Sequence, residues 1–324
     1  MPRPITFTDP VRTTQFSPRQ LRPRAVLDLA FNGFARWMEA HLVPFPRLLH
    51  AHHRALAVQS LRIDYRAPDP VFADYTDRPR LTARTSVTFS DCGGFAAVEL
   101  SCAAPGGRGW RDGPGDEGGC PGRDGEGPGA GRHTGREAVR ARLIARILEL
   151  QDAASMSALP GTLPPELRSL LSADGLGPAA GLRSPDLRPD PFGADATPAV
   201  LARDWRTSLH RGHCEVADQW SFVEMTELAA QARERLYTVG PPGAPPDTPP
   251  PPAALDAVRL PLRALVAVFH RPLFVFDACR VRTTAHTPVP AVGPVYRHEV
   301  YADGGGARRD GRPHLRVWEL LSEE

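Results

Sequence analysis

A short polar stretch carries side chains that could do acid–base or nucleophilic chemistry. It reads Arg211-Gly-His-Cys-Glu-Val-Ala-Asp218 and is followed at once by an amphipathic segment. A carboxylate in such a turn can act as a general base or a nucleophile, and a histidine beside it can donate a hydrogen bond to a substrate. The N-terminus of a helix adds free backbone N–H groups and the positive end of a dipole. The stretch therefore predicts a site at the start of a helix.

Each of these side chains also has a plainer interpretation. Asp218 stands where a helix N-cap is expected, and capping is the commonest role of an aspartate there. Glu215 could be solvated in a polar turn, His213 could lie on the surface, and Cys214 has no evident base beside it. The catalytic residues predicted on this helix and its preceding turn are Glu215, His213, Asp218 and Glu227, with Ser221 and Gln219 as substrate-binding neighbours.

Composition argues against several other classes of protein. The chain has 324 residues, of which 41% are hydrophobic and 23% charged, as expected for a soluble globular protein. All 39 basic residues are arginine, but they are spread among 37 acids, so no basic stripe predicts nucleic-acid binding. No apolar run is long enough to span a bilayer and no signal peptide is evident, so we expect a cytoplasmic protein without membrane contact. Five widely spaced cysteines fit neither a disulfide framework nor a zinc site.

Periodicity predicts the same order of elements in two regions of the chain. In each region an amphipathic helix comes before a series of strands. The first region has a helix at Val26–Leu42 and strands at Leu56–Tyr65, Arg80–Phe89 and Phe95–Cys102. The second has a strand at Asp204–Leu209, a helix at Gln219–Leu236 and strands at Leu262–Phe269, Leu273–Thr284, Val295–Tyr301 and His314–Leu320.

The two regions are separated by a stretch rich in glycine and proline. Pro105–Gly135 has too little apolar surface to offset the entropy of ordering it, so we expect disorder there. Apolar residues on one face predict a helix at Arg136–Asp152, and a short helical piece is expected near Pro165–Leu171. The predicted division is an N-terminal half at 1–104, a linker at 105–199 and a C-terminal half at 200–324.

The two halves repeat each other. When Phe34 is aligned with Phe222, Glu39 is aligned with Glu227. Further along the chain, Tyr65-Arg-Ala-Pro68 corresponds to Phe269-His-Arg-Pro272. A helix wrapped by a long antiparallel sheet, present twice, resembles the double hot-dog fold of acyl-thioester enzymes. The resemblance covers roughly residues 20–104 and 200–322. It implies an α+β chain that acts on acyl-CoA or on an acyl carrier protein and needs no cofactor.

The same resemblance implies roles for residues of the polar turn. Many hot-dog thioesterases have an acidic residue in the turn before the central helix, and Cys214-Glu-Val-Ala217 resembles the Cys-Asp-Pro-Ala version. Glu215 would then be the catalytic carboxylate, and Glu227 a mid-helix carboxylate that faces the substrate. Asp218 and Gln219 depart from the glycine and the histidine or isoleucine usual there. No equivalent polar turn is evident before the first helix, so we predict one working site, in the second half.

Several other residues are candidates for the walls of this site. Asn32 takes the place that Trp220 has in the second half, and His270 could pair with Glu215. Related acyltransferases rely on a strand tyrosine of the first half, and Tyr65 is the nearest candidate for it, although its neighbours match poorly. The cluster His50-Ala-His-His53 suggests a metal site, but residues so close on a loop seldom converge on a metal without a carboxylate. We expect no metal.

Hydrolysis of a thioester is the activity that the turn favours, in a setting of secondary metabolism. A dehydratase that pairs His270 or His213 with Glu215 is the nearest alternative. An acyltransferase or decarboxylase acting on a carrier-bound polyketide intermediate, with Tyr65 in the site, is a third. A non-catalytic protein that binds thioesters is kept open by Asp218 and Gln219. Whether the chain forms a homodimer also stays open.

Overall fold

A computed structural model describes residues 4–66, 71–75, 80–103, 137–152, 157–171, 175–177, 191–193, 197–214, 219–238, 259–289, 293–303 and 311–322. The first half contains a short leading strand, two 3-10 turns, two helices and four long strands. They are β1 (Ile5–Pro10), η1 (Thr13–Gln15), α1 (Pro23–His41), α2 (Phe45–His52), β2 (Arg54–Tyr65), η2 (Phe72–Tyr75), β3 (Arg80–Ser90), β4 (Phe95–Ala103) and β5 (Glu137–Asp152). Three short elements follow: β6 (Ser157–Pro160), α3 (Pro165–Leu170) and β7 (Leu176–Gly177).

The second half repeats the leading strand, the 3-10 turn, the long helix and the four strands. They are β8 (Ala199–Ser208), η6 (Arg211–His213), α4 (Phe222–Thr238), β9 (Leu262–Phe269), β10 (Ala278–Val289), β11 (Gly293–Ala302) and β12 (Leu315–Leu321). Most of the predicted strands agree with these within a few residues. The predicted helix at Gln219–Leu236 corresponds to α4, and that at Val26–Leu42 corresponds to α1.

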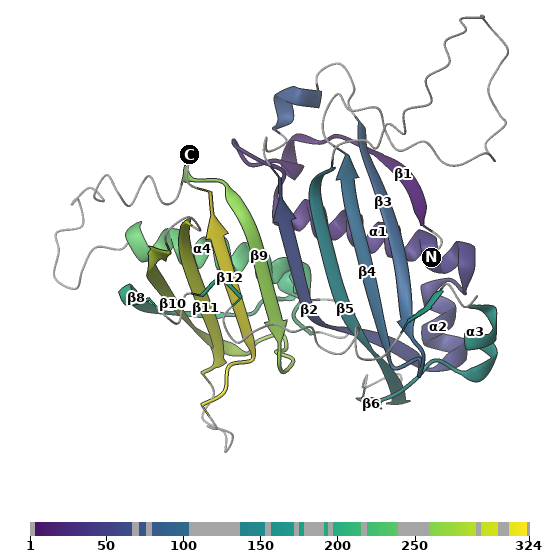
Figure 1. The fold of residues 1–324 in the computed structure, drawn as a ribbon. Coiled ribbons are helices and arrows are strands. Elements are labelled where there is room, and N and C mark those ends of the chain that lie inside the picture. Colours follow the sequence, from purple (N-terminus) through teal and green to yellow (C-terminus); the bar gives the residue numbers. More distant parts are fainter. Residues whose placement is uncertain are drawn as a thin grey trace, which may run out of the picture.

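All long strands belong to one sheet with a symmetric order (Figure 1). The order is β1-β3-β4-β5-β2-β9-β12-β11-β10-β8, so the second half follows the order of the first in reverse. The halves meet where β2 and β9 pair antiparallel, from Ser60 opposite Val268 to Asp64 opposite Ala264. The predicted duplication is therefore confirmed, and the two units share a continuous sheet.

One anchor of the predicted repeat is confirmed and the other is wrong. Tyr65 and Phe269 each end the strand that follows the long helix of their half. Phe222, however, begins α4, whereas Phe34 lies in the middle of α1, so the matches of Phe34 with Phe222 and of Glu39 with Glu227 are wrong. Sliding a helix by 11 residues is about three turns, which restores the same apolar face and hides the error.

The helix predicted at Arg136–Asp152 is wrong, because this segment is the long central strand β5. Val139 and Leu143 are four residues apart, a spacing that fits one face of a helix and also one face of a strand. Arg140 and Arg142 between them point to the other face of the sheet, as strand alternation requires. The first half therefore extends to residue 152, and its boundary at 104 is too early.

A short helix, α2, was not predicted. Pro44 and Pro46 were interpreted as the end of the preceding helix, but Pro44 is the N-cap of α2 and Pro46 lies in its first turn. Proline suits the first turn of a helix, where its missing N–H has no partner to lose. His50 and His52 therefore lie on a helix instead of a loop.

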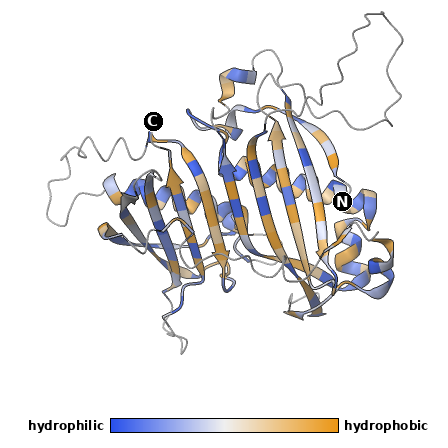
Figure 2. Cartoon of the chain, viewed as in Figure 1, coloured by the Kyte–Doolittle hydropathy of each residue, from blue (hydrophilic) through white to orange (hydrophobic). Residues whose placement is uncertain are grey.

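Both long helices cover the same face of the sheet and enclose the core (Figure 1). Along the strands, apolar side chains of the core alternate with side chains of the outer face, and Figure 2 shows the mixture of apolar and polar residues. The outer face carries many polar residues and two small apolar clusters, Ala97 with Ile144 and Ala264 with Val295 and Leu320. None of the described helices is long and apolar enough to cross a membrane.

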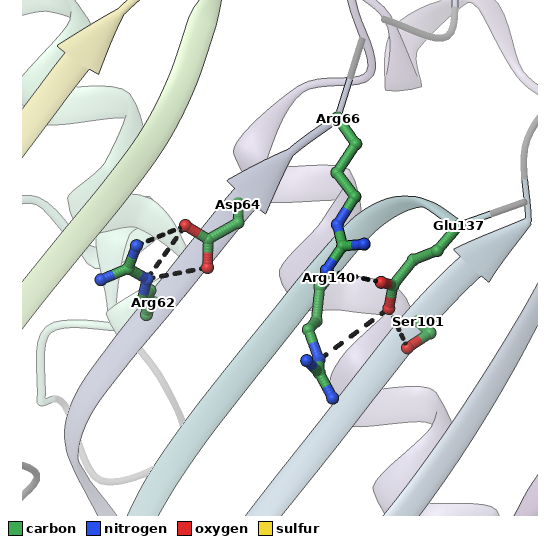
Figure 3. A network of polar contacts seen from close by, with 6 residues as sticks. All are labelled: Arg62, Asp64, Arg66, Ser101, Glu137 and Arg140. Atoms are coloured by element: carbon green, nitrogen blue, oxygen red, sulfur yellow. Dashed lines mark hydrogen bonds and ion pairs between the residues drawn. The ribbon is translucent and has the colours of Figure 1, made fainter. Parts of the chain in front are cut away.

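Charged side chains line the outer face of the sheet in the first half. Figure 3 shows six residues there: Arg62, Asp64, Arg66, Ser101, Glu137 and Arg140. Glu137 accepts a hydrogen bond from the Ser101 hydroxyl, and its carboxylate lies 3.1 Å from the Arg66 guanidinium and 3.8 Å from that of Arg140. Exposed pairs of this kind contribute little to stability, but they keep this face solvated. The chemistry of interest lies on the helix side.

Candidate active site

The first three residues of the polar stretch before α4, Arg211–His213, fold as the 3-10 turn η6. The backbone N–H of His210 donates to Nδ1 of His213 over 3.1 Å, and the N–H of His213 donates to the carbonyl oxygen of His210 over 2.8 Å. Because Nδ1 of His213 accepts a hydrogen bond, neutral His213 carries its proton on Nε2. Nε2 is then a donor, which suits stabilisation of a carbonyl oxygen better than removal of a proton.

Backbone contacts join this turn to the start of α4. The N–H of Ser221 donates to the carbonyl oxygen of His213 over 2.9 Å, and Cys214 forms an isolated bridge with Trp220. Trp220 is 3% exposed, so its indole anchors the junction in the core. His213 is therefore held beside the first turn of α4 by the main chain on both sides of it.

The first half has the same turn, so the prediction that it lacks one is wrong for the backbone. In η1 the N–H of Arg12 donates to Oε1 of Gln15 over 2.7 Å, and the N–H of Arg22 donates to the carbonyl oxygen of Gln15 over 2.8 Å. Phe16 and Leu21 form the matching isolated bridge. Gln15 thus holds the place of His213 and closes its turn with one side-chain acceptor.

The difference between the two turns lies in the side chains. An amide oxygen and an imidazole nitrogen can both accept the closing hydrogen bond, as Gln15 and His213 do. The shared bond is structural, and the two turns differ in the group that remains: Gln15 keeps its amide nitrogen, whereas His213 keeps the second ring nitrogen, Nε2.

The loop between β9 and β10 holds the chain just before α4. The N–H of Trp220 donates to the carbonyl oxygen of Leu273 over 2.8 Å, and Gln219 forms an isolated bridge with Phe274. The loop itself is fixed by Asp277, whose carboxylate accepts from the N–H of Phe274 over 2.8 Å. Gln219, a predicted substrate-binding residue, thus has a backbone role in this support.

Ser221 caps α4. Its hydroxyl oxygen accepts from the N–H of Val223 over 3.3 Å, and the helix begins at the next residue, Phe222. The predicted capping role of Asp218 is therefore wrong, because the position before the helix belongs to Ser221. A hydroxyl that accepts this bond keeps its own proton for another acceptor. The predicted role of Ser221 in orienting a water or a substrate stays a prediction.

Glu215 and Asp218 lie outside the described residues. Their predicted catalytic roles therefore stay predictions. The flanking residues, Cys214 and Gln219, are described, and each is fixed by a backbone bridge.

The first turns of α1 and α4 lie close together and bring charged groups to the start of α4. The Arg24 guanidinium lies 2.9 Å from the Glu224 carboxylate. Partial burial between the helices raises the pKa of Asp28, Arg24 opposes this effect, and Glu224 adds to it. Asp28 keeps contact with solvent, so it is a carboxyl with a perturbed pKa that a substrate could reach.

Asp28 was not predicted as a site residue, although the sequence held a signal for it. Counted from the helix starts at Pro23 and Phe222, Asp28 and Glu227 occupy equivalent positions in the two halves. Glu227 is half-buried on α4 and stays a candidate. The mistaken overlay of Phe34 on Phe222 concealed this pair of carboxylates.

Three other predicted residues are not brought to the turn by the contacts described for them. Asn32 is exposed on α1. Tyr65 is buried, and its hydroxyl donates to the carbonyl oxygen of Leu21 over 2.8 Å, which is a structural role. The backbone N–H of His270 donates to the carbonyl oxygen of His314 over 2.8 Å. Partial burial lowers the pKa of the His270 side chain, and nearby arginines lower it further.

The histidine cluster on α2 shows no metal-like arrangement. His52 lies 3.6 Å from the Glu166 carboxylate of α3, while His50 and His53 are exposed. Within the described part of the chain, no group of three or more histidine, cysteine, aspartate or glutamate residues could hold a metal ion.

Three solved structures share this architecture over almost the whole chain. The 12:0-ACP thioesterase from Umbellularia californica has a TM-score of 0.60 at 10% identity, covering 99% of this chain and 94% of that one. A protein provisionally described as an oleoyl thioesterase from Lactobacillus plantarum has a TM-score of 0.63 at 9% identity, with coverage of 99% and 95%. An acyl-ACP thioesterase from Bacteroides thetaiotaomicron has a TM-score of 0.56 at 9% identity, with coverage of 98% of each chain.

The chain is a double hot-dog. The full-length match and the mirrored strand order together show this fold. No family model matches the sequence, and no curated protein matches it in sequence either. In this double hot-dog a 3-10 turn precedes the central helix of each unit, with Gln15 closing the first and His213 the second.

Proposed function

We propose that this double hot-dog protein hydrolyses an acyl thioester of coenzyme A or of an acyl carrier protein, at the turn before α4. The observation that carries the proposal is the position of His213, whose Nε2 carries a proton beside the start of a helix. The fold is shared with proteins named as acyl-ACP thioesterases, which supports the choice of substrate class. A setting in secondary metabolism is part of the proposal.

The chemistry would use side chains, backbone amides and water. The thioester carbonyl oxygen would accept from Nε2 of His213 and from the free N–H groups in the first turn of α4. Glu215 would take a proton from water while the water oxygen bonds to the carbonyl carbon. The carbon–sulfur bond then breaks, and the thiolate takes up the proton held by Glu215. The products are a carboxylic acid and a free thiol.

A panel of acyl-CoA and acyl-carrier thioesters, analysed by mass spectrometry, tests the activity. Hydrolysis is expected to yield the free acid and the free thiol in equal amounts. Loss of water from a 3-hydroxyacyl thioester, with the thioester intact, would indicate a dehydratase instead. If no thioester is consumed at micromolar protein, the enzyme proposal fails.

His213→Gln tests the proposed location with the fold preserved. Gln15 shows that glutamine can close this turn, so the variant should unfold at the same temperature as wild type. Removing one donor to a developing oxyanion typically lowers kcat by about 10²- to 10³-fold, and we expect a loss of that order. His50→Gln is the matched control, because His50 is an exposed histidine on α2, which belongs to the first half, whereas η6 belongs to the second. Equal rates for the two variants would place the chemistry elsewhere.

A further inference from the structure

A cluster of charged and polar side chains is buried between α4 and the sheet of the second half. The Thr283 hydroxyl lies 3.0 Å from Nδ1 of His298, and Nε2 of His298 lies 3.1 Å from Oε2 of Glu319. The same Oε2 accepts from Nη1 of Arg233 over 3.1 Å. None of the four residues is more than 6% exposed. They come from β10, β11, β12 and α4, so the cluster ties three strands to the helix.

The cluster is ionic even though it is buried. Burial by itself would raise the pKa of Glu319, but the Arg233 guanidinium and His298 outweigh this, and the pKa is lowered. Glu319 is then a carboxylate that can only accept, so Nε2 of His298 donates to it. Nδ1 of His298 is left to accept from the Thr283 hydroxyl. A buried ion pair costs desolvation energy that can exceed its mutual attraction, so its presence is weak evidence for a role in stability.

Two polar atoms of this ion pair find no partner among the described residues. They are Oε1 of Glu319 and Nε of Arg233, and both are buried. A buried carboxylate oxygen without a donor and a buried guanidinium N–H without an acceptor are each costly. A hydroxyl group can donate to the first and accept from the second. The unsatisfied oxygen and N–H of the pair therefore match a hydroxyl group, of an alcohol or of a water molecule, better than a carbonyl or an amine.

The first half shows that the fold does not require this cluster. Counted from the helix starts, Phe34 of α1 holds the place of Arg233 in α4. Phe34 is buried among apolar residues. One residue earlier, α1 approaches β3 so closely at Gly33 that an added Cβ would overlap the side chain of Thr85.

The strands beneath the two helices show the same contrast between an apolar residue in the first half and a charged one in the second. Leu61 of β2 lies opposite Leu143 of β5, four residues before the end of β2 at Tyr65. Leu265 of β9 lies opposite Glu319 of β12, four residues before the end of β9. Both members of the ion pair therefore replace apolar residues of the first half. Charged side chains occupy a layer that the same fold can close with apolar packing.

We propose that the Arg233–Glu319 pair binds a hydroxyl group carried on the distal part of the acyl chain. This inference rests on the proposed function, because it assumes that the acyl chain starts at the turn and runs along α4. Arg233 lies 11 residues beyond Phe222, which is about 16 Å along the helix axis. A hydroxyl on the third carbon of the chain would be too near the thioester to reach it. The substrate class is therefore an acyl chain of medium length hydroxylated at or near its far end.

Binding of free fatty acids tests the inference without requiring hydrolysis. Terminally hydroxylated acids, their unsubstituted counterparts of equal length and the 3-hydroxy isomers would be titrated calorimetrically into the wild-type protein. We expect the terminal hydroxyl to improve Kd by about tenfold or more, as a hydrogen bond to a charged group does. The 3-hydroxyl should give no such gain. Equal Kd values for terminal hydroxy and plain acids would overturn the inference.

The double variant Arg233→Met/Glu319→Gln separates recognition from folding. It removes both charges together, and the new amide oxygen can still accept from His298, so the fold should persist, as checked by circular dichroism and thermal unfolding. The preference for terminal hydroxy acids is expected to fall to about one. A preference that survives in the folded variant contradicts the inference. If thioesters are not hydrolysed but the hydroxyl preference is found and lost as described, only the proposed function fails.

Discussion

The two helix–sheet layers of this chain have the same backbone plan and different contents. Under α1 the positions that correspond to Arg233 and Glu319 hold the apolar core residues Phe34 and Leu143. Under α4 the layer holds the ion pair of Arg233 and Glu319. The turn before each helix differs in the same way, since His213 replaces Gln15 within a shared backbone. Under the two proposals made above, the first unit supports the fold and the second binds the substrate.

The largest contrast is expected from breaking the ion pair on one side only. Glu319→Leu leaves the Arg233 charge buried and unpaired, which should lower the free energy of unfolding by about 3–5 kcal/mol. The double variant Arg233→Met/Glu319→Gln should lose far less, within about 1 kcal/mol of wild type. Urea unfolding measures both. Equal losses would mean that ordinary packing, and not an uncompensated charge, explains the cost.

In the first half, the loss of stability on substitution of a core residue should come from the cavity that is left and not from an unpaired charge. Met38 is fully buried on the inner face of α1, and Met38→Ala should lower the free energy of unfolding by about 2–5 kcal/mol. No partner substitution should restore it, because no charge is left unpaired. The same urea unfolding, repeated across pH, should give a constant difference from wild type. A loss of stability in Met38→Ala that depends strongly on pH would contradict the view that only the second layer depends on a buried charge.

Acid should weaken the second layer specifically. The pKa of Glu319 is lowered in the folded protein, so its contribution to stability is full above the ordinary value of 4.5 and is lost as the pH falls through the folded value. Wild type should therefore lose stability relative to the double variant below about pH 4.5. Unfolding curves of the two proteins, measured in parallel, isolate this group from the other carboxylates. A difference that is independent of acid pH would show that Glu319 does not titrate as argued.

A smaller and symmetric effect is expected from one tyrosine in each half. Tyr65 donates to the carbonyl oxygen of Leu21, and the hydroxyls of Tyr237 and Tyr296 lie 2.8 Å apart. Tyr65→Phe and Tyr237→Phe should each lower the free energy of unfolding by about 0.5–1.5 kcal/mol. Thermal unfolding can resolve the two values. A much larger loss of stability for Tyr237→Phe would indicate that the Tyr237–Tyr296 pair is energetically coupled to the buried charged cluster.

Most of the fold could be predicted because strand alternation and helical spacing are local signals. They misled at β5, where Val139 and Leu143 fit both periods, and at α2, where prolines begin a helix. The turn η6 was visible because its polar residues are adjacent in sequence. Its twin η1 was missed because the two turns share hydrogen bonds and not residue types.

The buried cluster could not be predicted, because Arg233 and Glu319 are far apart in the chain. The sequence of β12 nevertheless contained one sign of the cluster. Glu319 lies two residues from Val317 and two from Leu321, which both face the core. Because side chains two residues apart on a strand share a face, this periodicity places a charge on the apolar face. Its partner could be identified only once the helix was laid on the sheet.

The most direct test of the proposed site compares one carboxylate from each half. Glu215→Gln and Asp28→Asn, each a minimal loss of charge, would be assayed for hydrolysis of the acyl thioester that wild type cleaves fastest. We predict that Glu215→Gln abolishes measurable turnover, whereas Asp28→Asn retains most of it and shows mainly an altered pH profile. Loss of turnover in Asp28→Asn with full activity in Glu215→Gln would place the catalytic carboxylate on the helix of the first half and contradict the proposed site.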